Sequence, residues 1–365
     1  MKFIDLKAQY LQHKIKIDAA ISGVLSHGQF LFGPEVSELE KALADYVGSK
    51  NCIVMSSGTT ALHVALMALD IQPDDEIITV PFSFFATAEV AYLMRAKLHY
   101  VEIDRNTYLM NPDLLEAAIT KKTKAIITVS LYGQCCNMDV INAIAKRYNV
   151  PVIEDAAQSF GATYKNRKSC NISEIACTSF FPSKPLGAYG DGGACFTNDT
   201  ALAKKMRLII NHGQDVRYHH VALGMNGRMD TLQAAILLEK LKFFDHEVKQ
   251  RQQVANWYHD GLTAINIQPP IILDYNNSVY AQYTIQVDHR DLVQKKLSEL
   301  DIPTAVHYPI GLHQQPYVRT QHKQDVQSFP VTELCAKRVL SLPFYPSMSR
   351  EDVEIVCERL KSVMN

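Results

Sequence analysis

The chain has 365 residues, with 37 Lys and Arg residues against 38 Asp and Glu residues and a formal net charge of -1. A charge so close to zero excludes a broad nucleic-acid-binding surface, which needs a basic excess, although it leaves room for a small local anion site. The 47 % of hydrophobic residues excludes a disordered chain. Since one domain usually takes ~100–200 residues, we expect two domains.

Signals for export, membrane insertion and metal binding are not found in the sequence. No stretch reaches ~18 uninterrupted apolar residues, and the most apolar one, residues 77–94, is broken by Pro81 and Glu89. Asp5 and Gln9 stand where a signal peptide needs an apolar core. The eight cysteines form no CxxC pair, which disfavours a zinc site. We therefore expect a cytoplasmic protein with reduced, mostly buried thiols, no metal and no membrane partner.

The first two thirds of the chain alternate between helical and strand patterns. Apolar residues recur at helical spacing in residues 36–46, 62–69 and 141–145. Short β-like runs fall between them, at residues 76–80, 98–103, 125–130, 150–154, 175–181 and 194–197. This alternation predicts an α/β fold with a mainly parallel sheet covered by helices on both faces. In such sheets ligands bind beyond the carboxyl ends of the strands.

The pattern changes in the last third. A long helix is predicted over residues 229–258, and Pro269 and Pro270 then interrupt the chain. Alternation predicts a strand over residues 280–287, followed by a helix over residues 291–300. We place a boundary near residue 245. It divides a large domain of residues 1–245, which includes the N-terminal segment, from a small C-terminal α+β domain of residues 246–365.

Residues 56–60, Ser-Ser-Gly-Thr-Thr, follow an apolar run and open the helix that begins near Ala61. Hydroxyls, a glycine and free backbone N–H groups at a helix N-terminus form a cup for an anion such as a phosphate. Taken alone, an ordinary Ser/Thr helix cap explains this motif at least as well. The chain has neither a GxxxxGK[ST] loop nor a GxGxxG turn after a strand, so it carries no P-loop or dinucleotide fingerprint.

Two further motifs offer an acid and an amine. Glu154 and Asp155 end a buried strand and point to opposite sides by strand alternation, and Gln158 follows three residues later. Lys184 lies between a proline-containing turn and a glycine-rich turn, and such a lysine forms a Schiff base when its site lowers its pKa. Taken alone, Asp155 could equally be a helix cap, and Lys184 could equally be a solvated loop lysine.

The three motifs together predict a binding site for pyridoxal 5'-phosphate. The cup holds the phosphate, Lys184 takes the aldehyde, and Asp155 accepts a charge-assisted hydrogen bond from the pyridine nitrogen, which keeps the ring an electron sink. Phe84 follows the strand at residues 76–80 and is the candidate that stacks on the ring, with a core aromatic as the alternative.

Across essentially its whole length the sequence resembles the pyridoxal phosphate-dependent nucleotide-sugar aminotransferases of DegT type, which share fold type I. The segments that carry the resemblance are FGPEVSELEKALADYVG, SSGTTAL, DEIITVPFSFFATAEV, VIEDAAQSFGA, TSFFPSKPLGAYGDGGA, HHVALGMNGRMDTLQAAIL and AVHYPIGLHQQP. The segments SLYGQC, RYHH, SVYAQYT and PTAVHYP resemble the branch that aminates a UDP-linked 3-oxo uronic acid. Members with His in place of the lysine dehydrate sugars, so Lys184 favours transamination.

The resemblance implies a role for each matching residue. Lys184 is the Schiff-base lysine, Asp155 pairs with the pyridine nitrogen, and Gln158 approaches the ring hydroxyl. The phosphate is bound by Gly58, Thr59 and Ser179, and by Asn226 from the neighbouring subunit of a homodimer. Positions near the sugar, also expected from the neighbour, are Arg228, His307 and Tyr308. Arg228 or His307 is expected to contact the substrate carboxylate. The pair His219 and His220 is expected to be structural or near the substrate, and not metal-binding.

The implied reaction moves the amino group of L-glutamate to a UDP-linked 3-oxo sugar and releases 2-oxoglutarate. The expected substrate is UDP-2-acetamido-2-deoxy-3-oxo-D-glucuronate, and the product serves surface polysaccharides such as lipopolysaccharide O-antigen or capsule. A 4-oxo nucleotide-sugar aminotransferase is the nearest alternative. A non-catalytic regulator would need a basic DNA-binding extension, and a nicotinamide oxidoreductase would need the absent glycine fingerprint.

Overall fold

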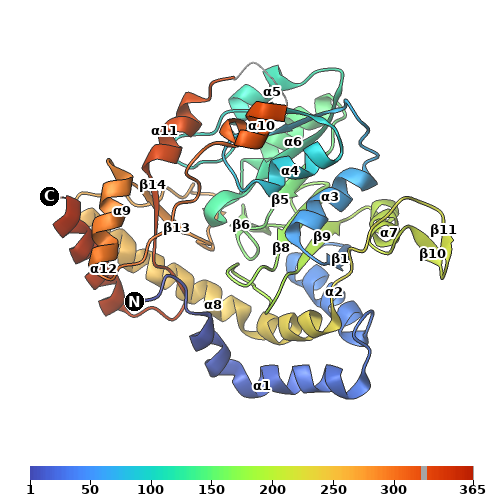
Figure 1. The fold of residues 1–365 in the computed structure, drawn as a ribbon, viewed down its shortest axis with the longest axis horizontal. Helices are drawn as coiled ribbons and strands as arrows, with labels where there is room; N and C mark the ends of the chain where they lie inside the picture. Colours follow the sequence, from blue (N-terminus) through green and yellow to red (C-terminus); the bar gives the residue numbers. More distant parts are fainter. Residues whose placement is uncertain (322–326, 365) are drawn as a thin grey trace.

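The computed structural model describes residues 1–321 and 327–364, and its centre is a seven-stranded sheet (Figure 1). All neighbouring strands pair in parallel except β9, which runs antiparallel to both of its neighbours. The predicted mainly parallel sheet is therefore confirmed. In spatial order the strands are β1 (Asn51–Met55), β9 (Gly193–Thr197), β8 (Ile175–Ser179), β5 (Val152–Asp155), β4 (Thr123–Val129), β2 (Glu76–Thr79) and β3 (Lys97–Tyr100).

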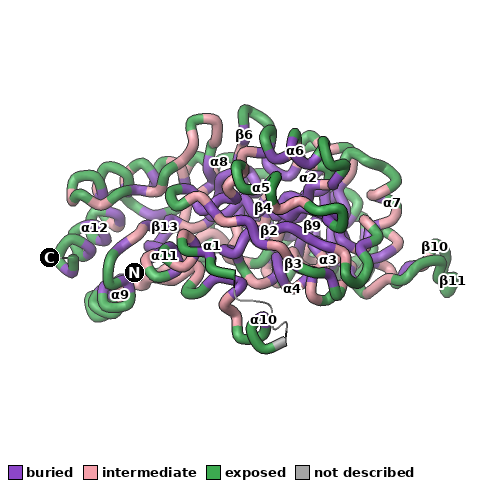
Figure 2. The backbone as a smooth tube through the Cα atoms, turned by 90° about the horizontal axis from the view of Figure 1, so that it is seen from above, coloured by how far each residue is buried: buried purple, intermediate pink, exposed green. Residues whose placement is uncertain are grey.

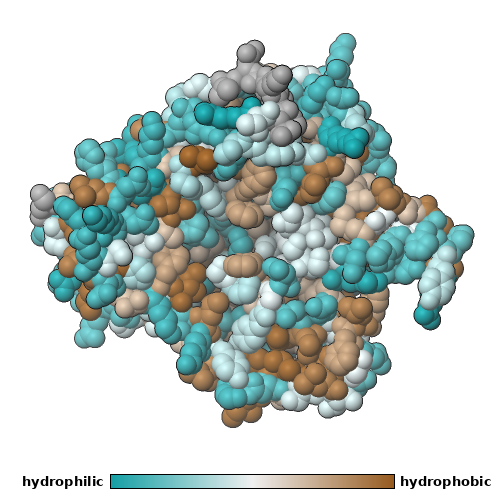
Figure 3. Space-filling view, viewed as in Figure 1, coloured by the Kyte–Doolittle hydropathy of each residue, from teal (hydrophilic) through white to brown (hydrophobic). Residues whose placement is uncertain are grey.

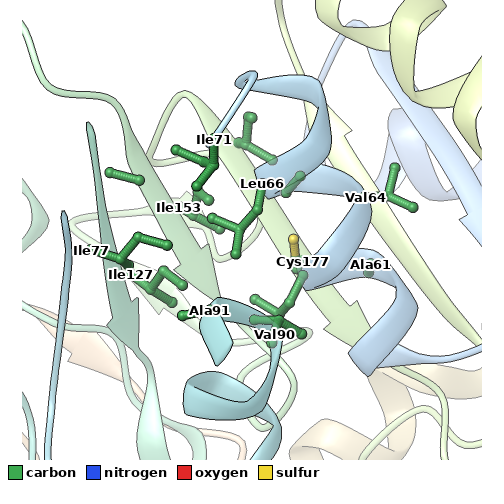
Figure 4. Close-up of a cluster of buried hydrophobic side chains, with 14 of the residues drawn as sticks. Ala61, Val64, Leu66, Ile71, Ile77, Val90, Ala91, Ile127, Ile153 and Cys177 are labelled. Carbon is green, nitrogen blue, oxygen red and sulfur yellow. The ribbon is translucent and has the colours of Figure 1, made fainter. Parts of the chain in front are cut away.

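Helices cover both faces of this sheet, and the buried strands lie between them (Figure 2). Strand side chains alternate between the faces: Ile127 and Ile153 pack towards α3 and α4 (Figure 4), whereas Ile126 and Val152 pack towards α6. One face carries α3 (Gly58–Ala68), α4 (Ala86–Leu93) and α7 (Thr200–Ile209). The other carries α2 (Pro34–Val47), α6 (Met138–Arg147) and the first part of α8 (Thr231–Ala264).

The C-terminal part adds an antiparallel pair, β13 (Tyr283–Gln286) and β14 (Val339–Leu342), beside α9 (Arg290–Glu299) and α12 (Arg350–Met364). Its own cluster of buried residues includes Tyr258 and Leu262 from the end of α8, whereas Phe244 belongs to the cluster under the large sheet. Residue 245 lies inside the continuous helix α8, and the division of the chain there stays a prediction.

Several elements were not expected. The longest is α1 (Leu6–His27), which Asp5 caps by accepting a hydrogen bond from the Ala8 N–H, and which lies against α8 (Figure 1). Only two of its residues, Ile17 and Val24, are buried, which is too few for the apolar stripe that predicts a helix. The helices α4, α7 and α12 and the strand β14 were not expected either. The remaining unexpected elements are α5 (Leu115–Ala118), α10 (Pro316–Gln321), α11 (Pro330–Arg338), the hairpin β10 (Gln214–Val216) and β11 (His219–His220), the small sheet β6 (Thr163–Tyr164), β7 (Arg167–Lys168) and β12 (Asn276–Asn277), and 3-10 turns at Pro112–Leu114, Leu131–Gly133 and Leu312–Gln314.

Some predicted boundaries were too long. The strand expected over residues 98–103 ends at Tyr100, because only a single backbone hydrogen bond, from Val101 to Thr79, continues the pairing. The strand expected over residues 280–287 is paired only within β13.

Within residues 1–321 and 327–364, no helix combines the length and hydropathy that a bilayer crossing requires.

Candidate active site

A cavity of about 440 Å³ opens where β4, β5 and β8 end. The N-terminus of α3, the segment after β2, the turn after β8 and the chain around residue 307 form its walls. Nine residues predicted for the site line it: Gly58, Thr59, Phe84, Asp155, Gln158, Ser179, Lys184, His307 and Tyr308. His307 and Tyr308 were expected to come from the neighbouring subunit, but they line the cavity of their own chain, because the chain around residue 307 forms one of its walls. The sequence therefore places most of the expected polar groups in one cavity at the edge of the sheet where ligands of α/β folds bind.

Lys184 is held by a tight turn after β8. Its backbone N–H donates to the Phe181 carbonyl at 2.8 Å. A Cβ atom on Gly187 would lie 2.4 Å from the Pro182 carbonyl oxygen, so the turn accepts only glycine there. Burial lowers the pKa of Lys184 to about 8, an effect that the nearby carboxylate of Asp155 opposes. Near neutral pH a much larger fraction of this amine is therefore uncharged and nucleophilic than of an ordinary surface lysine.

Asp155 is the last residue of β5 and lies on the same side of the sheet as Ile153. Its carboxylate accepts hydrogen bonds from the Thr87 hydroxyl at 2.8 Å and from the Ala157 N–H at 3.2 Å. Burial raises the pKa of Asp155, while these two donors and Lys184 lower it. The donors thus favour the ionised carboxylate that a pyridinium partner requires.

Glu154 points to the opposite face, as strand alternation predicts. It accepts hydrogen bonds from the hydroxyls of Ser130 at 3.1 Å and Ser169 at 2.7 Å, and from the Cys170 N–H at 3.0 Å. Burial is the main cause that raises the pKa of Glu154 to about 7. This carboxyl group is outside the cavity.

The predicted phosphate cup lies at the start of α3. Ser57 caps the helix, accepting a hydrogen bond from the Thr60 N–H at 3.0 Å. Gly58 follows it, and a Cβ atom there would lie 2.6 Å from the Ser179 Cβ. This close approach brings the free N–H groups of the helix N-terminus beside the Ser179 hydroxyl, a donor set that suits a phosphate.

Gln158 and Tyr308 meet on another wall of the cavity. The Gln158 amide donates to the Tyr308 hydroxyl at 3.2 Å, and its carbonyl oxygen accepts from the Tyr132 N–H at 2.8 Å. Phe84 is 57 % exposed, with its ring centroid 6.2 Å from that of Tyr308. An exposed aromatic ring beside a polar cavity is free to stack on a ligand ring.

Asn226 and Arg228 do not line this cavity. The Arg228 guanidinium donates to the Asn211 side chain at 3.0 Å and lies 5.8 Å from the centre of the Phe32 ring. Its Nε atom is buried without a hydrogen-bond partner in the described residues. Asn226 is exposed and Arg228 is half-buried, and both lie outside the lining of the cavity that holds Lys184.

His219 and His220 lie on the exposed hairpin, away from the cavity. The Nδ1 atom of His219 is 2.8 Å from the Asp215 carboxylate, and the Nδ1 atom of His220 is 2.8 Å from the His212 carbonyl oxygen. Within the described part of the chain, no cluster of three or more His, Cys, Asp or Glu residues has the arrangement of a metal site.

Sequence reasoning missed Thr87 and Tyr132, which hold Asp155 and Gln158. Thr87 had a usable signal: Ser83 and Thr87 are four residues apart at the start of a helix that follows a strand, which directs both hydroxyls to the ligand edge. Tyr132 had none, because its contacts depend on a turn in which it adopts φ 57°.

The donor set fits pyridoxal 5'-phosphate. A half-buried amine, a buried carboxylate and a cradle in which Gly58 has no room for a side chain occupy three walls of one cavity. These are the groups that the aldehyde, the pyridine nitrogen and the phosphate need.

Comparison with known proteins agrees with this geometry. The DegT/DnrJ/EryC1/StrS aminotransferase family matches residues 12–361. The chain is 55 % identical over 360 residues to UDP-2-acetamido-2-deoxy-3-oxo-D-glucuronate aminotransferase of Pseudomonas aeruginosa, covering 99 % of each. It superposes on S. venezuelae DesV, solved in complex with a ketimine intermediate, with a TM-score of 0.96, 34 % identity and coverage of 99 % and 97 %. For Bacillus subtilis NtdA, solved with bound cofactor PMP, the TM-score is 0.89, with 34 % identity and coverage of 97 % and 82 %.

Proposed function

Because this chain belongs to the DegT/DnrJ/EryC1/StrS aminotransferase family and is a pyridoxal phosphate-dependent nucleotide-sugar aminotransferase, we propose that it aminates UDP-2-acetamido-2-deoxy-3-oxo-D-glucuronate at C3, with L-glutamate as the amino donor. The observation that carries the chemistry is the shared cavity of Lys184 and Asp155. The full-length similarity to the P. aeruginosa enzyme supports the substrate.

Bound pyridoxal phosphate supplies an electron sink for the carbon that carries the amino group. Lys184 is the group that takes a proton from that carbon of L-glutamate and, in the second half-reaction, delivers one to the sugar carbon. Burial lowers the pKa of its amine to about 8, so a fraction of this base is uncharged near neutral pH. Asp155 provides the negative charge that stabilises a protonated pyridine nitrogen, and Thr87 fixes the orientation of its carboxylate.

The remaining residues bind and orient. Gly58, Thr59 and Ser179 surround the place for the phosphate, Gln158 offers its amide to the ring hydroxyl, and Phe84 offers its ring face. Because these groups come from different elements of the fold, the ring is fixed relative to Lys184, and the amine meets the reacting carbon in one geometry.

A second copy of the chain completes each site in this proposal. Asn226 and Arg228 lie outside the cavity of their own chain. Phenylalanine rings with about half of their surface exposed lie at both places: Phe32 beside Arg228, and Phe84 and Phe181 at the cavity. Figure 3 shows hydrophobic side chains gathered over the region where α1 meets α2. Covering such rings favours association, so we place Asn226 and Arg228 in the partner's site within a homodimer.

The donor, the compartment and the pathway complete the proposal. L-glutamate gives 2-oxoglutarate in the first half-reaction, and the sugar ketone takes the amino group in the second. Eight free, buried thiols support a reducing compartment such as the cytoplasm. The 3-amino uronic acid would serve the synthesis of a surface polysaccharide such as lipopolysaccharide O-antigen or capsule.

A panel of keto sugars tests the substrate. The purified enzyme, loaded with pyridoxal phosphate and given L-glutamate, is assayed against UDP-linked 3-oxo uronate, UDP-linked 3-oxo hexose and dTDP-linked 4-oxo deoxysugar. We expect the highest kcat/KM with the 3-oxo uronate. Higher kcat/KM with the 4-oxo sugar would replace the proposed substrate with the alternative one.

A further inference from the structure

The Arg228 side chain is held by two groups from distant parts of the chain. Its Nη1 atom donates to the Asn211 side-chain oxygen at 3.0 Å, and its guanidinium carbon lies 5.8 Å from the centre of the Phe32 ring. Since a guanidinium only donates, the amide of Asn211 must turn its oxygen towards Arg228. The face of an aromatic ring attracts a cation. Together these contacts restrict the guanidinium to one orientation.

The backbone beside Arg228 is fixed by the ends of two elements of the large sheet and its helices. The Gly227 N–H donates to the carbonyl of Ile210, which follows α7, and the Gly227 carbonyl accepts from the N–H of Ser56, which follows β1; both distances are 2.9 Å. An isolated bridge also pairs Asn211 with the residue before Gly227. Asn211 and Arg228 are therefore parts of one connected backbone frame.

Phe32 is fixed in place on the other side of Arg228. The Thr231 N–H donates to the Phe30 carbonyl at 3.0 Å, and the Thr231 hydroxyl accepts from the Gly33 N–H at 3.1 Å. These bonds enclose Phe32, which adopts φ 54°, a left-handed conformation that is uncommon for a bulky side chain. Its ring is 52 % exposed. A strained backbone that places an exposed ring over a cation points to a role for that ring.

The cavity itself offers little positive charge to a uronate. Among the described residues that line it, Lys184 is the only Lys or Arg, and the proposed reaction uses its amine. Burial lowers the pKa of His307 to about 4, so this ring is uncharged at neutral pH. Enclosing a carboxylate without a cation is costly. The charge of a uronate therefore calls for a cation from outside the lining.

We propose that Asn211 and Phe32 are positioning residues, which hold the Arg228 guanidinium so that its Nη groups bind the carboxylate of the uronate substrate in the partner's site. The inference rests on the proposed substrate and homodimer. Arg228 is half-buried and its Nε atom is the enclosed part, so the Nη end is what a ligand reaches. Asn211 takes one Nη1 hydrogen, which leaves the other and both Nη2 hydrogens for the two carboxylate oxygens.

Two stable ligands that differ only at the carboxylate test the inference. UDP-2-acetamido-2-deoxy-D-glucuronate carries it, UDP-N-acetylglucosamine has a hydroxymethyl group instead, and neither has the reactive ketone. In titration calorimetry of the holoenzyme, we expect the wild type to bind the uronate at least ~10-fold more tightly. Asn211→Leu and Phe32→Leu should each reduce this preference at least ~3-fold by weakening binding of the uronate alone. Phe32→Tyr keeps the ring and should keep the preference.

Phe30→Leu is the matched control, because Phe30 is about as exposed as Phe32 but its ring is not the one over Arg228. It should bind both ligands as the wild type does. Three results would overturn the inference: no preference for the uronate in the wild type, an unchanged preference in Asn211→Leu, or equal weakening of both ligands, which a merely structural role would produce. If the ligands behave as expected but the 3-oxo uronate is not aminated, the proposed reaction fails while the inference stands.

Discussion

Thr87 and Asp155 are 68 residues apart in the chain and are joined by a hydrogen bond of 2.8 Å from the threonine hydroxyl to the carboxylate. Thr87 lies in α4, after β2, and Asp155 ends β5, so the bond links two elements that reach the same edge of the sheet. Burial raises the pKa of Asp155 and the Thr87 hydroxyl lowers it, so loss of this donor would raise that pKa further. Thr87 thus maintains the charge that Asp155 offers the cofactor.

Replacement of Thr87 by Val should therefore weaken catalysis while leaving the fold intact. We expect kcat to fall ~10-fold, since one hydrogen bond to a charged group is lost. Thr87→Ser keeps the hydroxyl and should retain most of the activity. Steady-state rates for the two variants measure the effect. Equal rates in Thr87→Val and the wild type would show that the Thr87 hydroxyl does not support Asp155 in catalysis.

Lys184 is predicted to be indispensable for turnover but not for binding. Lys184→Ala should lower kcat by at least ~1,000-fold, since the proton-transferring amine is gone, and should still bind pyridoxal phosphate non-covalently through the phosphate cup. In the wild type, borohydride should fix the cofactor to this lysine and bleach the visible band. Near-normal turnover of Lys184→Ala would show that another residue carries the chemistry.

The pH dependence follows from the same amine. Because burial lowers its pKa to about 8, the uncharged form increases as pH rises through that value. The rate of the glutamate half-reaction should rise with pH, reach half of its maximum at about pH 8 and level off above that value. Stopped-flow measurements across this range give the profile.

Gly58 should be essential to the phosphate cup. A Cβ atom there meets the Ser179 Cβ at 2.6 Å, so Gly58→Ala pushes the start of α3 away from Ser179. We expect the dissociation constant for pyridoxal phosphate to rise at least ~10-fold. Gly23→Ala is the matched control, because a Cβ atom at Gly23 has nothing within 4 Å. Titration of both apoproteins with cofactor compares them.

Arg228 is predicted to act in the neighbouring subunit. Lys184→Ala and Arg228→Gln should each be inactive with the uronate, and mixed dimers of the two should regain activity. In a heterodimer, one of the two sites combines the intact Lys184 of one chain with the intact Arg228 of the other. Random assortment makes about half of the dimers heterodimers, so the mixture should reach about a quarter of the wild-type rate. No recovery in verified heterodimers would place Arg228 in its own chain's site.

Glu154 should make the stability of the apoprotein depend on pH. Its pKa is raised from 4.5 to about 7 in the folded protein, so folding favours the protonated form. The stability that this carboxyl group contributes is present at low pH and is lost as pH rises from about 4.5 to about 7, by an amount of order 3 kcal/mol. Glu154→Gln should remove this dependence. Urea unfolding between about pH 5 and pH 8 compares the two proteins, and parallel curves would contradict the assignment.

Some features of the site could be predicted from the sequence and others could not. The opposite directions of Glu154 and Asp155 follow from strand alternation, and the position of Lys184 follows from its turn, so both could be predicted. The hydrogen-bond partners of the site residues could not be predicted. Tyr132 reaches His307 across 175 residues through a turn with positive φ, and no local pattern encodes such a contact. Helix α1 escaped prediction because its packing on α8 involves few regularly spaced apolar residues.

The most direct test of the proposed function is the fate of the amino nitrogen. The holoenzyme is given isotopically labelled L-glutamate and UDP-2-acetamido-2-deoxy-3-oxo-D-glucuronate, and the sugar product is examined by mass spectrometry and NMR. We predict one labelled nitrogen on C3 of the sugar and an equal amount of 2-oxoglutarate. An unlabelled or dehydrated sugar, or an unreacted ketone while a 4-oxo sugar is aminated, would contradict the account.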